Sequence, residues 1–193
     1  MSSCSKNEWI EANLNNEEIR NGQTSRHQVT HRGSQWQPPP CGWLKCNFDS
    51  GYMRGRSITN TGWIIRDSDG EVVLTGCAKL PAATTPLQAE ALGFLHALQV
   101  VWTHGMRQVW FESDNQELTT IINNCEDHSL IGSLLYDIRH WMLPLSSLAH
   151  VNRERNSAAD KMAQQALTIT SLYHSYSFPP VFLIPFLYQP YTI

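Results

Sequence analysis

The chain has 193 residues, a length that predicts one domain with extensions at its ends. Hydrophobic residues make up 41% and charged residues 16% of the chain, which excludes a highly charged disordered protein. The net charge of −3 excludes a globally cationic nucleic-acid binder, so binding of that kind would need a local site.

Composition divides the chain into three segments. Residues 1–42 are rich in Asn, Gln and Ser and contain a run of prolines, which predicts a disordered arm and a stiff Pro-rich linker. Residues 43–168 hold the periodic sequence that can form a core. Residues 169–193 contain no Asp, Glu, Lys or Arg and form an uncharged apolar tail.

The predicted elements all lie within the middle segment. Apolar periodicity predicts, in chain order, strands over 43–49, 61–66 and 71–78, a helix over 86–102, a strand over 108–113, helices over 115–124 and 130–141, a strand over 148–153, and a last helix that Asn156 caps and that ends near residue 166. Thr85 is the expected N-cap of the first helix, and Gln88 completes a capping box. Three strands followed by alternating helices and strands predict an α/β fold, with a five-stranded mixed sheet and helices on both faces.

The apolar tail contains a run over 178–188 that is shorter than the ~20 residues a membrane helix needs, and prolines interrupt it. We therefore expect the tail to pack on the domain or on a protein partner, and we expect no membrane contact. The five cysteines include no CxxC pair, and the N-terminal region has no apolar targeting segment. This pattern is typical of reduced thiols in a nuclear or cytoplasmic protein.

Four acidic residues stand at or near the ends of predicted elements. Asp49 closes the first strand, Glu90 lies early in the first helix, Asp114 follows the fourth strand, and Asp160 opens the last helix. Carboxylates brought together repel one another unless a cation compensates, and hard oxygen ligands suit Mg²⁺ or Mn²⁺. Two such ions would support in-line displacement at phosphorus. The alternative is that Asp114 caps a helix while Glu90 and Asp160 only complement helix dipoles.

The sequence also resembles a known family along most of the middle segment. The segments that carry the resemblance are CNFD (46–49), TGWIIRD (61–67), QAEAL (88–92), ESD (112–114) and HVNRERNSAAD (150–160). They are similar to the plant reverse-transcriptase-like branch of the type 1 ribonuclease H family, which occurs in plant retroelements and as free-standing proteins. The resemblance implies the ribonuclease H fold, two bound Mg²⁺ ions (Mn²⁺ is possible) and endonucleolytic cleavage of the RNA strand of RNA–DNA hybrids. It also implies that Asp49, Glu90, Asp114 and Asp160 are the metal-binding acids, with Asp49 between both ions.

Further residues are candidates for contact with a hybrid. The resemblance places Gln116 at a position that contacts the minor groove in cellular members of the family. Backbone amides near Ser50 and Gly51 are expected to contact 2′-hydroxyl groups across a wide minor groove. Asn47 shares a strand face with the first acid, so it would contact the substrate or support the acids. Asn156 is also expected to contact the substrate.

Departures from the family pattern favour a second hypothesis. The loop before the last helix is shorter than in bacterial members, where a mobile histidine assists turnover, and His150 is the candidate for an auxiliary role. The middle helices lack a basic segment, and no separate hybrid-binding module is present, so few phosphate contacts are expected. Lys45 and Arg153 are among the basic residues that would hold phosphates or lie on a solvated surface. The alternatives to an enzyme are a retroelement remnant that binds hybrid or RNA without catalysis and an interaction protein that uses its tail. We expect a monomer.

Overall fold

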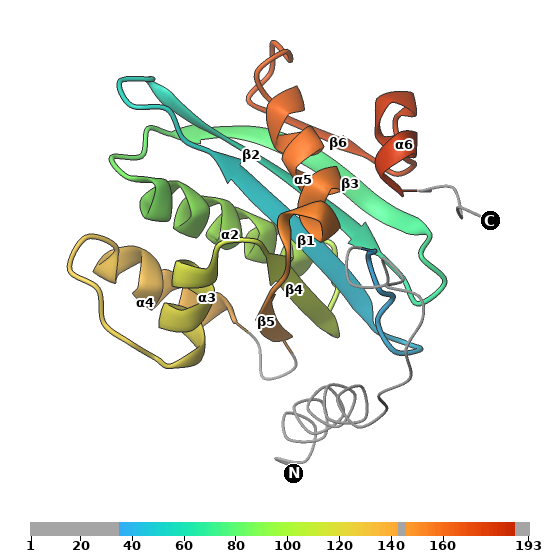
Figure 1. Ribbon diagram of the computed structural model, residues 1–193, viewed down its shortest axis with the longest axis horizontal. Coiled ribbons are helices and arrows are strands. Elements are labelled where there is room, and N and C mark those ends of the chain that lie inside the picture. The colour runs from blue at the N-terminus through green and yellow to red at the C-terminus, as the bar shows by residue number, and fades with distance from the viewer. Residues whose placement is uncertain (1–34, 143–145, 188–193) are drawn as a thin grey trace, which may run out of the picture. The chain divides into compact units, whose positions relative to one another are not determined.

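The computed structural model describes residues 35–142 and 146–187. Residues 1–34, which form most of the predicted arm, lie outside the described residues. The described residues form an α/β fold with one mixed sheet and helices on both faces (Figure 1). The strands are β1 (Leu44–Gly51), β2 (Ile58–Arg66), β3 (Val72–Pro81), β4 (Val109–Ser113), β5 (Ser146–His150) and β6 (Tyr173–Tyr176). The helices are α2 (Pro86–Thr103), α3 (Gln116–Asn123), α4 (Gly132–Trp141), α5 (Arg153–Gln165), the 3₁₀ turn η1 (Val181–Leu183) and α6 (Ile184–Leu187). The predicted fold class is confirmed, but the sheet has six strands and not five, because the tail contributes β6.

The strand order is β5-β4-β1-β2-β3-β6, which places β1 in the middle of the sheet. β1 pairs antiparallel with β2 and parallel with β4. The β1–β4 register joins Asn47 to Glu112, so Asp49 on β1 and Asp114, directly after β4, follow two residues later. Asp49 does not close the first strand as predicted, because β1 continues to Gly51 through its pairing with β2. Because side chains alternate between faces of a strand, this register brings both acids to the same side of the sheet.

Two apolar clusters hold the helices on the sheet. The larger cluster joins the sheet to α2, α3 and α4 and includes Phe48, Phe94, Phe111, Leu118 and Ile138. The smaller cluster joins the opposite face of the sheet to α5 and the tail and includes Ile64, Cys77, Ala159, Met162 and Leu183. Both faces of β1 and β2 are therefore covered, and the site acids lie where the covering helices approach the central strands.

Helix starts agree with the predictions at α2 and α3. The Thr85 hydroxyl accepts from the Gln88 backbone N–H at 3.1 Å, while the Gln88 side chain accepts from the Thr84 backbone N–H and not from that of the cap residue. Asn115 caps α3 by accepting from Leu118 N–H at 2.8 Å. The alternative of a helix cap for Asp114 is therefore wrong.

The start of α5 differs from the prediction. The helix begins at Arg153 after the cap residue Asn152, so Asn156 lies one turn inside it and is not its cap. The strand that precedes it ends at His150 and not at Arg153. Asn156 does not cap the helix because it is fully buried and its side chain bonds to the sheet. Asp160 consequently lies two turns into α5 and does not open it.

The folded unit extends beyond residues 43–168 at both ends. On the N-terminal side, Trp36 and Gln37 bond to residues of β1. On the C-terminal side, β6 pairs antiparallel with β3, and Leu183 of the tail is fully buried in the cluster that joins the sheet to α5. Packing on the domain was one of the two alternatives for the tail, and the described part of the tail packs in this way. In the part of the chain that the structure describes, no helix is both long and apolar enough to cross a membrane.

Candidate active site

Three of the four predicted acids converge at one point. Asp49 on β1, Glu90 on α2 and Asp114 after β4 each offer a carboxylate oxygen, and these oxygens lie within 4.8 Å of one another. Glu90 is buried, whereas Asp49 and Asp114 are half-buried. We call these three residues the carboxylate cluster. The interpretation of Glu90 as a residue that only complements a helix dipole does not account for this convergence.

Two glycines permit the close approach of helices that forms the site. A Cβ at Gly93 would overlap the hydroxyl of Ser50, so Gly93 allows α2 to lie close to β1 and to bring Glu90 beside Asp49. A Cβ at Gly62 would overlap the backbone of α5 near Ala163. Neither glycine is among the residues predicted from the sequence to form the site. A lone Gly inside a strongly helical pattern costs about 1 kcal/mol relative to Ala, and that cost is the signal that could have drawn attention to Gly93.

Electrostatics distinguish the members of the cluster. Burial, and then the charges of Asp114 and Asp160, raise the pKa of Asp49 from 3.8 to about 7, while Arg153 opposes this shift. Burial, and then the charges of Asp49 and Asp114, raise the pKa of Glu90 well above its ordinary value. Without a cation the site therefore resists holding its full negative charge at neutral pH.

The donor set fits a hard divalent cation. All three groups of the cluster are carboxylates, the ligand type that Mg²⁺ and Mn²⁺ prefer. Glu90 Oε2 is buried and has no hydrogen-bond partner among the described residues. A buried carboxylate oxygen without a partner is costly, and a cation beside it would remove that cost.

Asp160 lies near the carboxylate cluster but outside it. Its charge raises the pKa of Asp49, yet its oxygens do not fall within the group that shares 4.8 Å. Asp160 Oδ2 accepts instead from Gln164 Nε2, one turn along α5, at 2.9 Å. The structure therefore brings together three of the predicted acids and places the fourth beside them.

The predicted substrate-contact residues divide into accessible and buried groups. Gln116 is exposed at the first position of α3, two residues after Asp114. Gly51 is half-buried at the end of β1, whereas Ser50 is 8% exposed and its hydroxyl donates to Thr61 Oγ1 at 3.2 Å. His150 is exposed at the last position of β5, where the register pairs it with the residue before Asp114.

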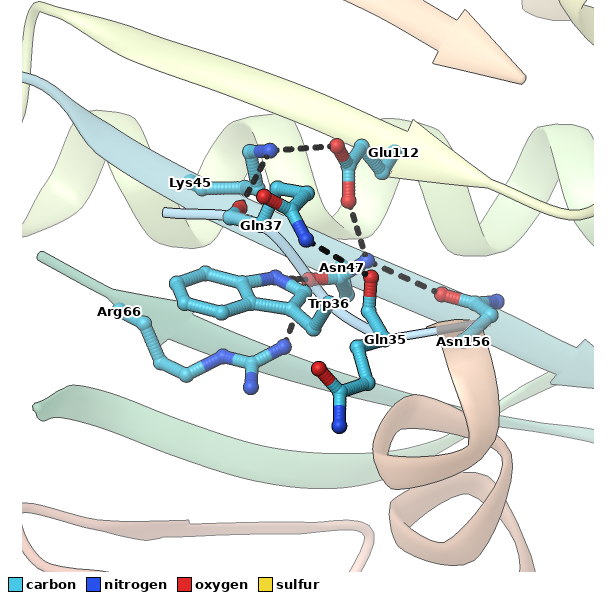
Figure 2. A network of polar contacts seen from close by, with 8 residues as sticks. All are labelled: Gln35, Trp36, Gln37, Lys45, Asn47, Arg66, Glu112 and Asn156. Atoms are coloured by element: carbon cyan, nitrogen blue, oxygen red, sulfur yellow. Dashed lines mark hydrogen bonds and ion pairs between the residues drawn. The ribbon is translucent and has the colours of Figure 1, made fainter. Parts of the chain in front are cut away.

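Asn47 and Asn156 have no exposed surface and contact each other (Figure 2). Asn47 Nδ2 donates to Glu112 Oε2 at 3.0 Å and to Asn156 Oδ1 at 3.4 Å. Asn156 Nδ2 donates to the Phe48 carbonyl at 2.9 Å and to Asp114 Oδ1 at 3.5 Å. Their amides are thus committed to the protein interior, which favours support of the acids over direct contact with a substrate.

Lys45 and Arg153 have different surroundings. Lys45 is buried and forms an ion pair with Glu112 at 2.6 Å, so it neither holds a phosphate nor lies on a solvated surface. Burial lowers the pKa of Lys45 in spite of the opposing effect of Glu112. Arg153, by contrast, is exposed at the start of α5 and faces Asp49 closely enough to lower its pKa.

Solved structures share this architecture. RNase H1 from the halophilic archaeon Halobacterium salinarum matches with a TM-score of 0.60 and 24% identity, over 66% of this chain and 98% of that one. LC11-RNase H1, isolated from compost and solved in complex with an RNA/DNA hybrid, matches with a TM-score of 0.58 and 19% identity, over 65% of this chain and 96% of that one. At these identities the likeness establishes the fold, which is that of ribonuclease H.

Sequence comparison then identifies the family. The profile described as "Reverse transcriptase-like" matches residues 47–166, more than half of the chain, and the chain belongs to that family. A curated relative from Arabidopsis thaliana, "Putative ribonuclease H protein At1g65750", is 26% identical over 148 residues. The match covers 75% of this chain but only 24% of the relative, so the chain spans about a quarter of that protein's length. The resemblance to the reverse-transcriptase-like branch is confirmed.

Proposed function

We propose that this protein is a divalent-metal-dependent endonuclease that hydrolyses the RNA strand of RNA–DNA hybrids. The observation that supports this proposal best is the carboxylate cluster, with its oxygens within 4.8 Å and Glu90 Oε2 buried without a partner. The cluster lies on a ribonuclease H fold, and one solved protein of that fold, LC11-RNase H1, is in complex with an RNA/DNA hybrid. Membership in the reverse transcriptase-like family agrees with action on nucleic acid.

In the proposed mechanism the carboxylate cluster holds the cation and the surrounding residues orient the substrate. Asp49, Glu90 and Asp114 would supply the ligands, and Asp160 would complete a second site beside Asp49. A divalent cation supplies positive charge that stabilises negative charge on the phosphoryl oxygens during phosphodiester hydrolysis. The number of ions, two, and their identity, Mg²⁺ with Mn²⁺ as the alternative, are part of this proposal.

The hybrid would lie over the exposed residues around the cluster. Gln116 is exposed on the Asp114 side and would contact the minor groove, while the backbone near Ser50 and Gly51 lies on the Asp49 side. Contacts with 2′-hydroxyl groups would distinguish RNA from DNA. Arg153 faces the cluster from α5 and would meet a phosphate of the bound strand.

The test is cleavage of an RNA–DNA hybrid labelled on each strand in turn. We expect cuts in the RNA strand alone, in Mg²⁺ or Mn²⁺, and none with a chelator. Asp114→Asn removes a negative charge from the cluster at nearly constant volume and is expected to abolish cleavage. The matched control is Asp137→Asn on α4, which makes the same change at an exposed position outside the cluster and should cleave like the wild type.

Each other outcome has a definite meaning. Cleavage that persists in Asp114→Asn, or that needs no metal, would contradict the proposal. Hybrid that is bound but not cut by the wild type would favour the retroelement-remnant alternative. Cuts in the DNA strand would contradict the proposed substrate but not the metal site.

A further inference from the structure

A tryptophan outside the family-matched segment is bonded to the interior of the site. Trp36 precedes β1 and lies outside residues 47–166. Its indole Nε1 donates to Asn47 Oδ1 at 2.8 Å, and its ring lies 3.6 Å from the Arg66 guanidinium carbon (Figure 2). Trp36 therefore connects the segment before the sheet with a fully buried side chain of β1.

This contact fixes the orientation of the Asn47 amide. Asn47 Oδ1 accepts from two groups, Trp36 Nε1 and Arg66 Nη2, the latter at 3.1 Å. Indole and guanidinium nitrogens only donate, so the amide oxygen of Asn47 must face them. Asn47 Nδ2 then points the other way and donates to Glu112 and Asn156.

The orientation passes from Asn47 to the acids through Asn156. Because Asn156 Oδ1 accepts from Asn47, its Nδ2 is the group that faces the Phe48 carbonyl and Asp114 Oδ1. The Phe48 carbonyl belongs to the peptide that leads into Asp49. The two acceptors of Asn156 Nδ2 are therefore the backbone next to one member of the carboxylate cluster and the side chain of another. Asn47 and Asn156 are fully buried, so water does not compete for the bond between them, whereas the contact with Asp114 is only partly buried.

We propose that the Trp36 N–H, acting through Asn47 and Asn156, positions Asp114 for the divalent cation. Trp36 is a positioning residue in this proposal and contacts neither cation nor substrate. The proposal rests on the proposed function of the carboxylate cluster. It also implies that the segment before β1 tunes the metal affinity of a site from which it is separated by two side chains.

The ring and the N–H of Trp36 have separable roles. Trp36→Phe keeps an aromatic ring at this position and removes the N–H donor, together with the smaller ring of the indole, a loss that the control variant shares. Trp102 offers a matched control, since its Nε1 also donates, to the Trp141 carbonyl at 3.3 Å, and Arg107 lies 4.0 Å from its ring. Trp102→Phe therefore removes an equivalent bond beside an equivalent cation, but at the far end of α2 from Glu90.

The experiment is a calorimetric titration of Mn²⁺ into the full chain, with thermal unfolding of each variant measured alongside. We expect Trp36→Phe to raise the Kd for Mn²⁺ by about threefold to tenfold, the factor that one hydrogen bond provides. Trp102→Phe should lower the melting temperature comparably and leave the Kd unchanged. In a cleavage assay, Trp36→Phe should need more Mg²⁺ for half-maximal rate and recover most of the rate at saturating Mg²⁺.

Several results would overturn the proposal. An unchanged Kd in Trp36→Phe would make Trp36 a structural residue only, and equal weakening in both variants would mean a general loss of stability. Asn156→Ser interrupts the same series of hydrogen bonds at the end next to Asp114 and is expected to weaken Mn²⁺ binding at least as much. It therefore keeps the proposal testable if Trp36→Phe does not fold.

The Mn²⁺ titration also separates this proposal from the proposed function. A wild type that binds Mn²⁺ without cleaving hybrid would contradict the proposed function, while the comparison of Kd values would still decide the role of Trp36. A wild type that binds no Mn²⁺ would overturn both.

Discussion

We expect the stability of the protein in chelator to fall as the pH rises from about 5 to about 8, because Asp49 holds a proton in the folded state. Burial and the neighbouring charges of Asp114 and Asp160 raise the pKa of Asp49 from 3.8 to about 7. Between these two values the folded protein keeps a proton that the unfolded chain has released. The free energy of unfolding therefore decreases as the pH rises through this window.

The size of the effect follows from the pKa shift. One pKa unit corresponds to about 1.4 kcal/mol. Between pH 5 and the folded pKa of about 7, the free energy of unfolding therefore falls by about 2 to 3 kcal/mol. His96 acts in the opposite direction, because burial lowers its pKa and the unfolded chain then binds the extra proton. Glu90, whose pKa is also raised, acts in the same direction as Asp49. A comparison of the wild type with Asp49→Asn at each pH cancels the contribution of His96.

The assay is urea unfolding followed by tryptophan fluorescence, in chelator, at pH values across this range. Asp49→Asn cannot ionise, so its stability relative to the wild type should increase by about 2 to 3 kcal/mol between pH 5 and pH 8. Millimolar Mg²⁺ should stabilise the wild type near pH 8 and leave Asp49→Asn nearly unchanged, because a ligand stabilises only the state that binds it. A difference between the two proteins that does not change with pH would refute the reasoning.

Three further outcomes are expected. Gly93→Ala should destabilise the fold by about 1 to 3 kcal/mol in urea unfolding, because its Cβ would overlap the Ser50 hydroxyl; a neutral result would mean that α2 can shift away from β1. Leu183→Ala should lower the stability by about 2 to 3 kcal/mol in the same assay, since the residue is fully buried under α5, and an unchanged midpoint would show that the tail is not part of the cooperative unit. His150→Ala should leave hybrid cleavage unchanged, because the residue is held in the β5 ladder and not on a mobile loop; a large loss of rate would restore its auxiliary role.

The elements that could be predicted are those whose signals are local. Apolar periodicity and the Thr85 cap define α2 within a residue or two, and five strands follow from alternation. Asp49 lies near the end of β1 and Asp114 follows β4, but their approach depends on the parallel pairing of these strands, which the family resemblance implied and the local pattern did not. Local pattern therefore accounts for most of the sheet and for the positions of the two acids along the chain, but not for their meeting.

The features that could not be predicted depend on partners distant in sequence. β6 has the sequence Tyr-His-Ser-Tyr, with little apolar alternation, and forms because it pairs with β3. Asn156 looks like a helix cap until its bond to the Phe48 carbonyl, 108 residues away, is known. Trp36 is an isolated aromatic residue in a polar segment, and only the fold reveals Asn47 as its partner. Such pairings leave no periodic trace in the chain.

The sixth strand has a consequence for how the molecule behaves among its own copies. β6 covers residues 75–78 of β3, a ten-residue strand that would otherwise form an open edge of the sheet. Open edges present unpaired backbone groups to neighbouring chains and promote self-association. A fragment cut to the family-matched residues 47–166 would carry the site acids but lose this cover. The soluble unit for any study of the site is therefore expected to extend through the tail.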